Sequence, residues 1–410
     1  MNRNPAILPR AASALFRQAL GAMRVVVVMG PRQAGKSTFV RHDPATADRP
    51  YLTLDDPDTR LRARADPRAF VSNAPVTIDE VQRVPELVLA VKAAVDAQPT
   101  RRTGQYVLTG SAKLLDVPGI ADSLAGRAFY LQLWPMTRRE LLGLGETGIW
   151  GEFFAHSPTD WPDLVRAQTT PETPWQDAVS RGGFPEPALQ IEGDAERALW
   201  FRGYIGTFLE RDLRDLRAVG RIVDVERLMR AAALRLGNLL NVTELSRDTQ
   251  IPATTVRDYV TLLATSYQVV RLEAYAVNRT KRLIKTPKLY WNDAAVGLRL
   301  AGGPPGGAHF ENYVLTDLLA WRDSQLEQPE VTYWRTTTGL EVDFVIERGG
   351  ALLGIEAKAT SRPRPQDARG LRAFLEEYPD KAVGGLLLHT GQDVFWMHDR
   401  VLAVPWWRVM

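Results

Sequence analysis

The chain has 410 residues, of which 45% are hydrophobic and 24% charged, so it is long enough for two to four domains with packed cores. It contains no cysteine, which excludes disulfides, thiolate catalysis and cysteine–zinc sites. The longest apolar runs, such as Val25–Met29, are too short to span a bilayer, and the N-terminus lacks the order of a signal peptide. We therefore expect a cytoplasmic protein with no membrane partner.

The net charge of +3 is distributed unevenly. Residues 201–290 carry 16 Lys and Arg against 9 Asp and Glu, a net +7, which leaves 35 against 39, or −4, for the remainder. A local basic excess predicts that one domain faces a polyanion such as DNA. The alternative is a solvated helical face.

A phosphate-binding loop is predicted near the N-terminus. After a helix expected around Ala11–Leu20, the apolar run Val25–Met29 indicates a buried parallel strand, followed by a glycine-rich turn and a helix. The turn fits the pattern Gly-x-x-x-x-Gly-Lys-Ser, whose backbone N–H groups can surround a phosphate. The predicted nucleotide-binding residues are Gly30, Pro31, Arg32, Gln33, Ala34, Gly35, Lys36, Ser37 and Thr38.

These residues imply roles for particular side chains. Lys36 is placed to reach the β- and γ-phosphates of ATP, and Ser37 to hold Mg²⁺. The strand predicted at 76–80 ends in two acids, within an alternating α/β pattern. In nucleoside triphosphatases this arrangement places an aspartate beside Mg²⁺ and a glutamate beside the attacking water, so Asp79 and Glu80 are the candidates.

Two further candidates follow along the chain. The strand predicted at 106–111 ends in hydroxyls, so Thr109 or Ser111 could contact the γ-phosphate. Arg127 precedes the apolar strand 128–133 and could stabilise transition-state charge, in its own subunit or in a neighbour's site. The predicted catalytic residues are therefore Lys36, Glu80 and Arg127.

These motifs resemble a bacterial and archaeal family of AAA-type ATPases. The resemblance covers the phosphate loop, Ile-Asp-Glu-Val-Gln at 78–82, Leu-Thr-Gly-Ser at 108–111 and Leu-Ala-Gly-Arg at 124–127. The family's C-terminal region of unknown function, of the DUF4143 type, is resembled at 181–186, 208–212, 290–293 and 310–312. The resemblance implies ATP binding and hydrolysis. It also implies a homo-oligomer, with a hexameric ring as one possible form.

A winged helix-turn-helix is expected next. Helices are predicted at 225–236, 241–247 and 251–263, followed by a strand at 267–272 that would form a wing. On such a module Thr254, Thr255 and Arg257 would lie at the exposed start of the recognition helix. The basic run 279–288 could hold phosphates. Because this fold also binds proteins, both DNA and protein partners remain open.

The last region resembles the PD-(D/E)xK nucleases. A helix at 309–322 and strands at 342–346 and 352–358 are predicted, followed by a further helix and strand. Asp343 and Glu356 could hold Mg²⁺, and Lys358, on the same strand face as Glu356, could orient water. Glu311 could complete the site from the helix. The alternatives are a charged strand face and an inherited fold without cleavage, and a DNA-contacting or structural role of the domain is favoured over catalysis.

The predicted fold class is α/β. The expected domains are a P-loop AAA-type ATPase core (1–145), a helical lid or linker (146–220), a winged helix-turn-helix (221–285) and a nuclease-like α/β domain (286–410). The favoured function is an ATPase that couples ATP hydrolysis to binding or remodelling of duplex or branched DNA, with a ring motor as one form of it. The alternatives are an ATP-regulated, Mg²⁺-dependent DNA nuclease and a nucleotide-dependent protein-interaction switch.

Overall fold

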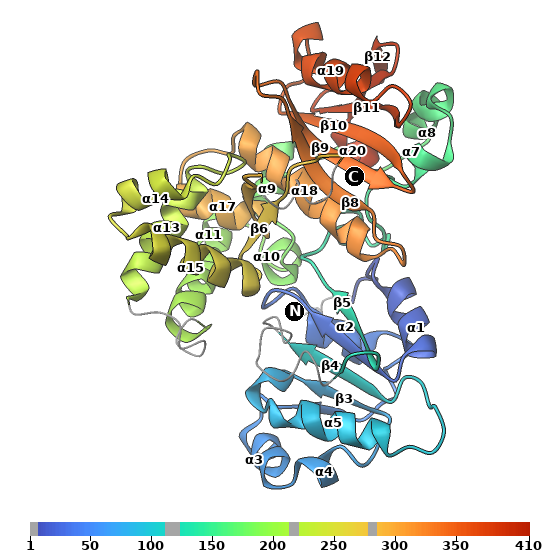
Figure 1. Cartoon of the computed structure of the whole chain (residues 1–410), viewed down its shortest axis with the longest axis vertical. Helices are drawn as coiled ribbons and strands as arrows, with labels where there is room; N and C mark the ends of the chain where they lie inside the picture. The colour runs from blue at the N-terminus through green and yellow to red at the C-terminus, as the bar shows by residue number, and fades with distance from the viewer. Residues whose placement is uncertain (1–6, 111–123, 213–220, 278–284) are drawn as a thin grey trace.

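The computed structural model describes residues 7–110, 124–212, 221–277 and 285–410 (Figure 1). The described chain contains a five-stranded, a six-stranded and a two-stranded sheet. In Figure 1 the N-terminal sheet lies at the bottom, the C-terminal sheet at the top, and helices from the middle of the chain at one side. No helix within these ranges is long and apolar enough to cross a membrane.

The N-terminal sheet is parallel, with the strand order β2-β3-β4-β1-β5. Its strands are β1 (Val25–Met29), β2 (Tyr51–Thr53), β3 (Val76–Asp79), β4 (Tyr106–Gly110) and β5 (Ala128–Gln132). Its helices are α1 (Ser13–Ala22), α2 (Lys36–His42), α3 (Pro57–Ala65), α4 (Pro67–Phe70), α5 (Glu86–Asp96) and the short η1 (Val81–Arg83). The predicted parallel α/β sheet is confirmed.

Helices cover both faces of this sheet, which explains the continuous apolar run of β1. Val25 and Val27 belong to the same buried cluster as Val88 of α5. Val26 and Val28 belong to a second cluster, which includes Phe16 of α1 and the α2 residues Phe39 and Val40. A strand that is buried on both faces needs apolar side chains at every position rather than at alternate ones.

A helical segment follows the N-terminal sheet. Its elements are α6 (Arg138–Leu141), α7 (Glu152–Ala155), η3 (Pro158–Asp160), α8 (Trp161–Arg166), α9 (Trp175–Arg181), α10 (Pro185–Leu189), α11 (Asp194–Thr207) and η4 (Phe208–Asp212). Within the lid expected at 146–220, α7 and α8 pack against the C-terminal sheet. Residues of α10 and α11 instead border the phosphate loop.

Three helices and two antiparallel strands come next; we call residues 222–291, as far as they are described, the three-helix module. Its elements are α13 (Ile222–Ala233), α14 (Val242–Thr249), α15 (Ala253–Thr265), β6 (Val269–Leu272) and β7 (Lys288–Trp291). Asn241 caps α14 by accepting the backbone N–H of Glu244 at 3.1 Å, as the sequence suggests. Leu239 adds an antiparallel bridge to Lys288.

The C-terminal region contains a mixed sheet with the order β12-β13-β11-β10-β9-β8. Its elements are α17 (Ala294–Ala301), α18 (Gly307–Asp323), β8 (Glu330–Arg335), β9 (Glu341–Arg348), β10 (Ala351–Lys358), η5 (Pro365–Ala368), α19 (Arg369–Glu377), β11 (Ala382–His389), β12 (Phe395–His398), β13 (Val401–Pro405) and α20 (Trp406–Val409). The sequence interpretation missed β8, β12 and β13. The edge strand β12 is short and mostly exposed, so it lacks a clear apolar pattern.

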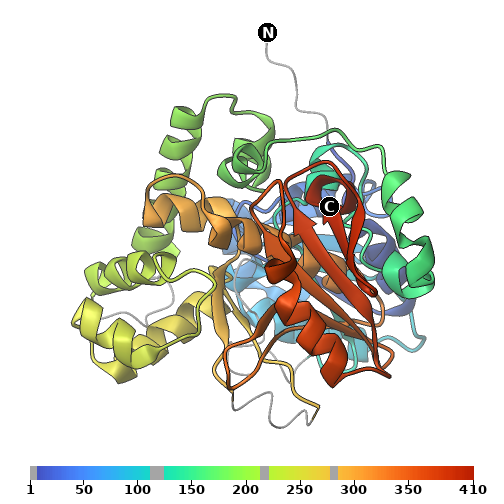
Figure 2. The ribbon, with the colours of Figure 1, turned by 90° about the horizontal axis from the view of Figure 1, so that it is seen from above.

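The three-helix module and the C-terminal sheet share one hydrophobic core. A single buried cluster includes Val256 and Leu263 of α15, Tyr290 of β7 and Phe344 of β9. Figure 2 shows the module and the six-stranded sheet side by side. The boundary expected between 285 and 286 falls just before β7, which pairs with β6, so the first strand after that boundary belongs to the module's own sheet.

Candidate nucleotide site

Two glycines shape the phosphate loop between β1 and α2. Gly30 has a φ of +146°, and a Cβ at this position would lie 2.1 Å from the carbonyl oxygen of Leu133. Gly35, immediately before α2, has a φ of +90°. Glycine adopts such backbone angles without the steric cost that other residues incur. The two glycines of the pattern are therefore required by the path of the backbone.

The buried side chain of Lys36 lies over this loop. Its Nζ donates to the carbonyl oxygens of Gly30 at 3.0 Å and of Pro31 at 2.7 Å. On the other side, the Arg10 guanidinium donates to the carbonyl oxygen of Ala34 at 2.9 Å and pairs with buried Glu140 at 3.0 Å. The loop is thus held by two cations, of which only Lys36 was predicted.

The carboxylate of Asp79 lies at the end of β3 and is surrounded by hydroxyl groups. The Ser37 Oγ lies 3.0 and 3.1 Å from its two oxygens, and the Tyr51 hydroxyl donates to Oδ2 at 2.7 Å. The Thr109 hydroxyl also donates to Asp79. Burial and the hydrogen bond to Asp79 raise the pKa of Tyr51, which therefore stays protonated as a donor. The sequence interpretation missed Tyr51.

Glu80 adopts an uncommon backbone conformation beside this carboxylate. Its φ of +58° and ψ of +45° are left-handed, and its N–H donates to the Thr109 hydroxyl at 3.0 Å. The Gln82 side chain donates to the Glu80 carboxylate. Left-handed non-glycine residues are strained and occur often at functional sites. Gln82 stands in the quoted Ile-Asp-Glu-Val-Gln motif, although no role was assigned to it.

Two cavities meet above the phosphate loop. One, of about 470 Å³, is lined by loop residues from Arg32 to Thr38, by Asp55 and Glu80, and by residues of α10 and α11 that include Glu186 and Tyr204. The other, of about 450 Å³, is lined mainly by the N-terminal segment, α2 and α10. The residues common to both are Gly35, Thr38, Pro185 and Gln190. Pro185 stands in the signature quoted at 181–186, to which no role at the nucleotide site was assigned, and nothing in the sequence pattern pointed to Gln190.

The segment that carries Pro185 is fixed at Gly183. The N–H of Met136 donates to the Gly183 carbonyl at 2.7 Å, and the Gly183 N–H donates to Asp293 Oδ2 at 2.6 Å. Asp293 also caps α17 by accepting the N–H of Ala295 at 2.8 Å. Burial raises the pKa of Asp293 to about 6 although these N–H groups donate to it.

Arg127 lies at the opposite end of the sheet from the phosphate loop. It directly precedes β5, whose first residue pairs with Val25, whereas the loop follows the last residue of β1. Its guanidinium pairs with Asp96 at 2.6 and 3.0 Å. The hypothesis that Arg127 acts in its own subunit is therefore wrong. A role in a neighbouring subunit remains a prediction.

The predicted DNA-binding residues lie at the start of α15. Thr254 and Arg257 are exposed and Thr255 is half-buried. Most of the basic run 279–288 lies outside the described residues, as does Ser111. Lys288, the last residue of that run, is buried. It is therefore not a surface contact for phosphates, and that part of the expectation is wrong.

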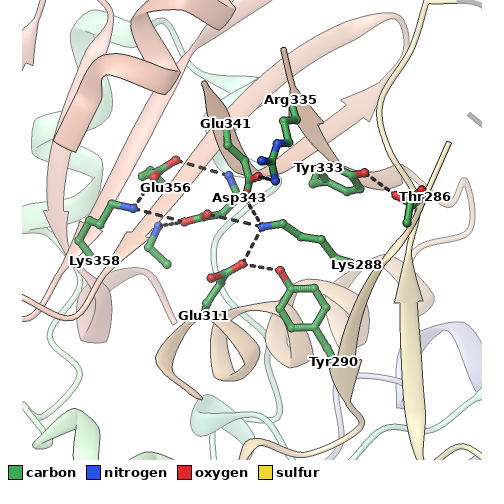
Figure 3. A network of polar contacts seen from close by, with 11 residues as sticks. Thr286, Lys288, Tyr290, Glu311, Tyr333, Arg335, Glu341, Asp343, Glu356 and Lys358 are labelled. Atoms are coloured by element: carbon green, nitrogen blue, oxygen red, sulfur yellow. Dashed lines mark hydrogen bonds and ion pairs between the residues drawn. The ribbon is translucent and has the colours of Figure 1, made fainter. Parts of the chain in front are cut away.

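The four residues predicted for a nuclease-like site do come together (Figure 3). Lys358 donates to Glu356, and the N–H of Ala357 donates to Asp343 Oδ2 at 2.9 Å. Glu311 accepts from Lys288 at 3.1 Å. Burial and the charge of Asp343 raise the pKa of Glu311 to about 7, while Lys288 lowers it. Within the described ranges, no group of three or more His, Cys, Asp or Glu residues is arranged to hold a metal ion.

Comparisons with known proteins identify three regions. Residues 22–142 match a family described as an AAA domain. Residues 172–305 and 306–409 match two domains of unknown function, DUF8612 and DUF4143. The predicted AAA-type core is confirmed, and the DUF4143-type region is confirmed for residues 306–409. The signatures quoted at 181–186, 208–212 and 290–293 lie instead in the region that matches DUF8612. The winged-helix and nuclease-like interpretations remain predictions.

Two relatives match almost the whole chain. An uncharacterised protein of Mycobacterium bovis and one of Mycobacterium tuberculosis are each 31% identical to it, over 97% of this chain and 83% of theirs. The chain belongs to their family. A Walker-type ATPase of Pyrococcus abyssi is similar in structure, with a TM-score of 0.40, 15% identity and coverage of 71% of this chain and 98% of that chain. We draw no conclusion about this chain from that similarity.

Replacing Gly30 by alanine should impair nucleotide binding. The new Cβ would collide with the Leu133 carbonyl and would disfavour the φ of +146°, so the loop must move. We expect ATP affinity to fall roughly tenfold or more, which requires only about 1.4 kcal/mol. Gly21→Ala in α1 is the control, since nothing lies within 4 Å of its Cβ position. Equal ATP affinities of the two variants in fluorescent-nucleotide titrations would contradict this interpretation of the loop.

Proposed function

We propose that the chain is an ATPase, that it hydrolyses ATP at the phosphate loop of its AAA domain, and that it couples hydrolysis to DNA binding. The observation that carries the first part is the convergence of Lys36, Ser37, Asp79 and Glu80 at one end of the parallel sheet. Lys36 and Ser37 begin α2, whereas Asp79 ends β3 and Glu80 follows it, and the 470 Å³ cavity adjoins Lys36, Ser37 and Glu80. Ligands of open α/β sheets bind at this edge.

The residues present fit a magnesium ion bound together with ATP. Ser37 and Asp79 lie side by side and offer the oxygen ligands that hard cations prefer, and they are the residue types that hold Mg²⁺ in P-loop NTPases. Bound Mg²⁺ neutralises charge on the β- and γ-phosphates. Lys36 would bind phosphate oxygens, and Glu80 would orient the attacking water and accept its proton. Thr109 would fix Glu80 relative to Asp79 through the two hydrogen bonds it makes.

The second cavity offers a place for the nucleoside. Its lining is largely apolar and includes Leu8, Pro9, Met136 and Leu189. It joins the phosphate cavity at Gly35 and Thr38, so one elongated ligand can occupy both. Together the two volumes lie within the range of nucleotide-sized pockets.

DNA binding is supported by the three-helix module. Its order of three helices and an antiparallel strand pair is that of a winged helix-turn-helix, and Thr254 and Arg257 at the start of α15 are exposed. Residues 201–290 also carry the basic excess of the chain. Nucleotide and DNA would be coupled through Gly183, which contacts the residue that caps α17 just after β7.

A homo-oligomer, including a ring, is part of the proposal because Arg127 could act only on a neighbour's nucleotide. A metal-dependent nuclease is not favoured, since the buried Lys288 already pairs with Glu311 and faces Asp343. The protein-interaction switch differs in a measurable way: it predicts no stimulation of ATP turnover by DNA.

Glu80→Gln should abolish hydrolysis while preserving ATP binding. The amide keeps the size of the side chain but cannot accept a proton, so we expect turnover to fall roughly 100-fold or more. Lys36→Ala should lose binding as well. Phosphate release and nucleotide titration measure the two effects. Glu86→Gln, an exposed position at the start of α5, is the matched control. Hydrolysis by Lys36→Ala at the rate of the unaltered chain would overturn the proposal.

DNA should stimulate ATP turnover and bind in a salt-dependent manner. Arg257→Ala removes one exposed charge from α15, so the slope of log affinity against log salt concentration should decrease in magnitude by about one. Arg166→Ala on α8 removes an equally exposed charge far from the module and should leave that slope unchanged. Fluorescence anisotropy on single-stranded, duplex, forked and four-way DNA measures both. Salt-independent binding, or no binding, would refute the DNA role.

A further inference from the structure

A cluster of lysines and carboxylates joins the three-helix module to the C-terminal sheet (Figure 3). We call it the lysine–carboxylate cluster. Lys288 comes from β7, Glu311 from α18, and the remaining members from β9 and β10. Its members are Lys288, Glu311, Glu341, Asp343, Glu356 and Lys358.

Lys288 occupies the centre of this cluster. Only 2% of the residue is exposed. Its Nζ lies 3.1 Å from Glu311 Oε1 and 3.9 Å from Asp343 Oδ1, and it also pairs with Glu341. Burial alone would lower the pKa of Lys288, but the three carboxylates raise it, so the ammonium stays charged.

The surrounding fold makes this position unusual for a lysine. The order α18-β8-β9-β10-α19-β11, with Asp343 on β9 and Glu356 and Lys358 on β10, resembles the nuclease-like arrangement in which two carboxylates hold Mg²⁺. In this chain the arrangement of the carboxylates does not fit Mg²⁺, because their oxygens already have other partners. Asp343 Oδ2 accepts the N–H of Ala357, and its Oδ1 faces Lys288.

The two carboxylate oxygens of Glu356 also have partners within the protein. One of its oxygens accepts from Lys358, and the other lies 3.4 Å from the N–H of Asp343. Glu311 accepts from both Lys288 and the Tyr290 hydroxyl. A divalent cation would therefore have to displace an ammonium that is already desolvated and paired, and removing such a partner is costly.

We propose that Lys288 takes the place of a divalent metal ion in the C-terminal domain, and that the domain is thereby a metal-free partner of the three-helix module rather than a nuclease. The positive charge comes from β7, so it is present only while the module is docked. This inference is independent of ATP hydrolysis.

Other contacts also join the three-helix module to the C-terminal sheet. The Tyr333 hydroxyl of β8 donates to the Thr286 carbonyl at 2.5 Å, just before β7. The Tyr333 N–H donates to the Glu273 carbonyl at 3.0 Å, and Ala274 forms a parallel bridge to Tyr333. With the shared hydrophobic core, the cluster makes the module and the C-terminal sheet one unit that would move together relative to the AAA domain.

The first test uses manganese as the probe on the full chain without nucleotide. Loss of the free Mn²⁺ signal in electron paramagnetic resonance counts bound ions. We expect the unaltered chain and Asp343→Asn to give superimposable titrations up to about 1 mM, because no site is open at the cluster. One additional Mn²⁺ per unaltered chain, absent from Asp343→Asn, would overturn the proposal. Glu311→Gln replaces Asp343→Asn if that variant does not fold.

The second test removes the internal cation. Lys288→Met leaves three carboxylates without their common partner, so the melting temperature should fall by roughly 5–10 °C. Adding Asp343→Asn should recover part of this loss by relieving repulsion. Lys285→Met, an exposed lysine three residues earlier, should melt like the unaltered chain. Equal melting temperatures for Lys288→Met and Lys285→Met would show that Lys288 does not hold the cluster together.

Discussion

The backbone of Gly183 is held from two sides by hydrogen bonds that connect the AAA domain with the cap of α17. Its carbonyl accepts from Met136, which follows the last strand of the AAA domain, and its N–H donates to Asp293. A Cβ at Gly183 would lie 2.3 Å from the Met136 carbonyl oxygen, so only glycine allows this approach. The same short segment thus contacts the AAA domain, the cap of α17 and, through Pro185, both cavities.

The hydrogen bonds of Gly183 differ from the hydrophobic packing that joins other parts of the molecule. The three-helix module and the six-stranded sheet share one continuous buried cluster, whereas the parallel sheet packs in two other clusters, one of which also includes Tyr267 of the module. Rigid units separated by few contacts are the usual basis of hinge movement in proteins. Any movement of the AAA domain against the combined module and sheet would have to accommodate the buried hydrogen bonds that Trp134 and Arg138 donate to the C-terminal region.

The parts of the site that were predicted are those in which chemistry demands particular residues at fixed spacing in a continuous stretch. The phosphate loop and the Asp79–Glu80 pair are of this kind. Arg10, Tyr51 and Pro185 could not be predicted, because they reach the site from separate segments and only the folded chain brings them there. A run of basic residues likewise does not reveal that its last member, Lys288, lies on a strand that turns inward.

The position of Arg127 can be understood from the order of the elements. A residue that precedes a parallel strand must lie at the amino edge of the sheet, while the phosphate loop lies at the carboxyl edge. The order of elements alone therefore argued against a role in the same subunit.

Pro185 and Gln190 border both cavities, so a nucleotide that fills them lies against the segment anchored at Gly183. If ATP is hydrolysed there as proposed, release of ADP would involve the segment that also leads to the three-helix module, and in many enzymes product release rather than bond cleavage limits turnover. In that case DNA would set the pace of the cycle by controlling how readily the spent nucleotide escapes, without touching any group that takes part in the chemistry.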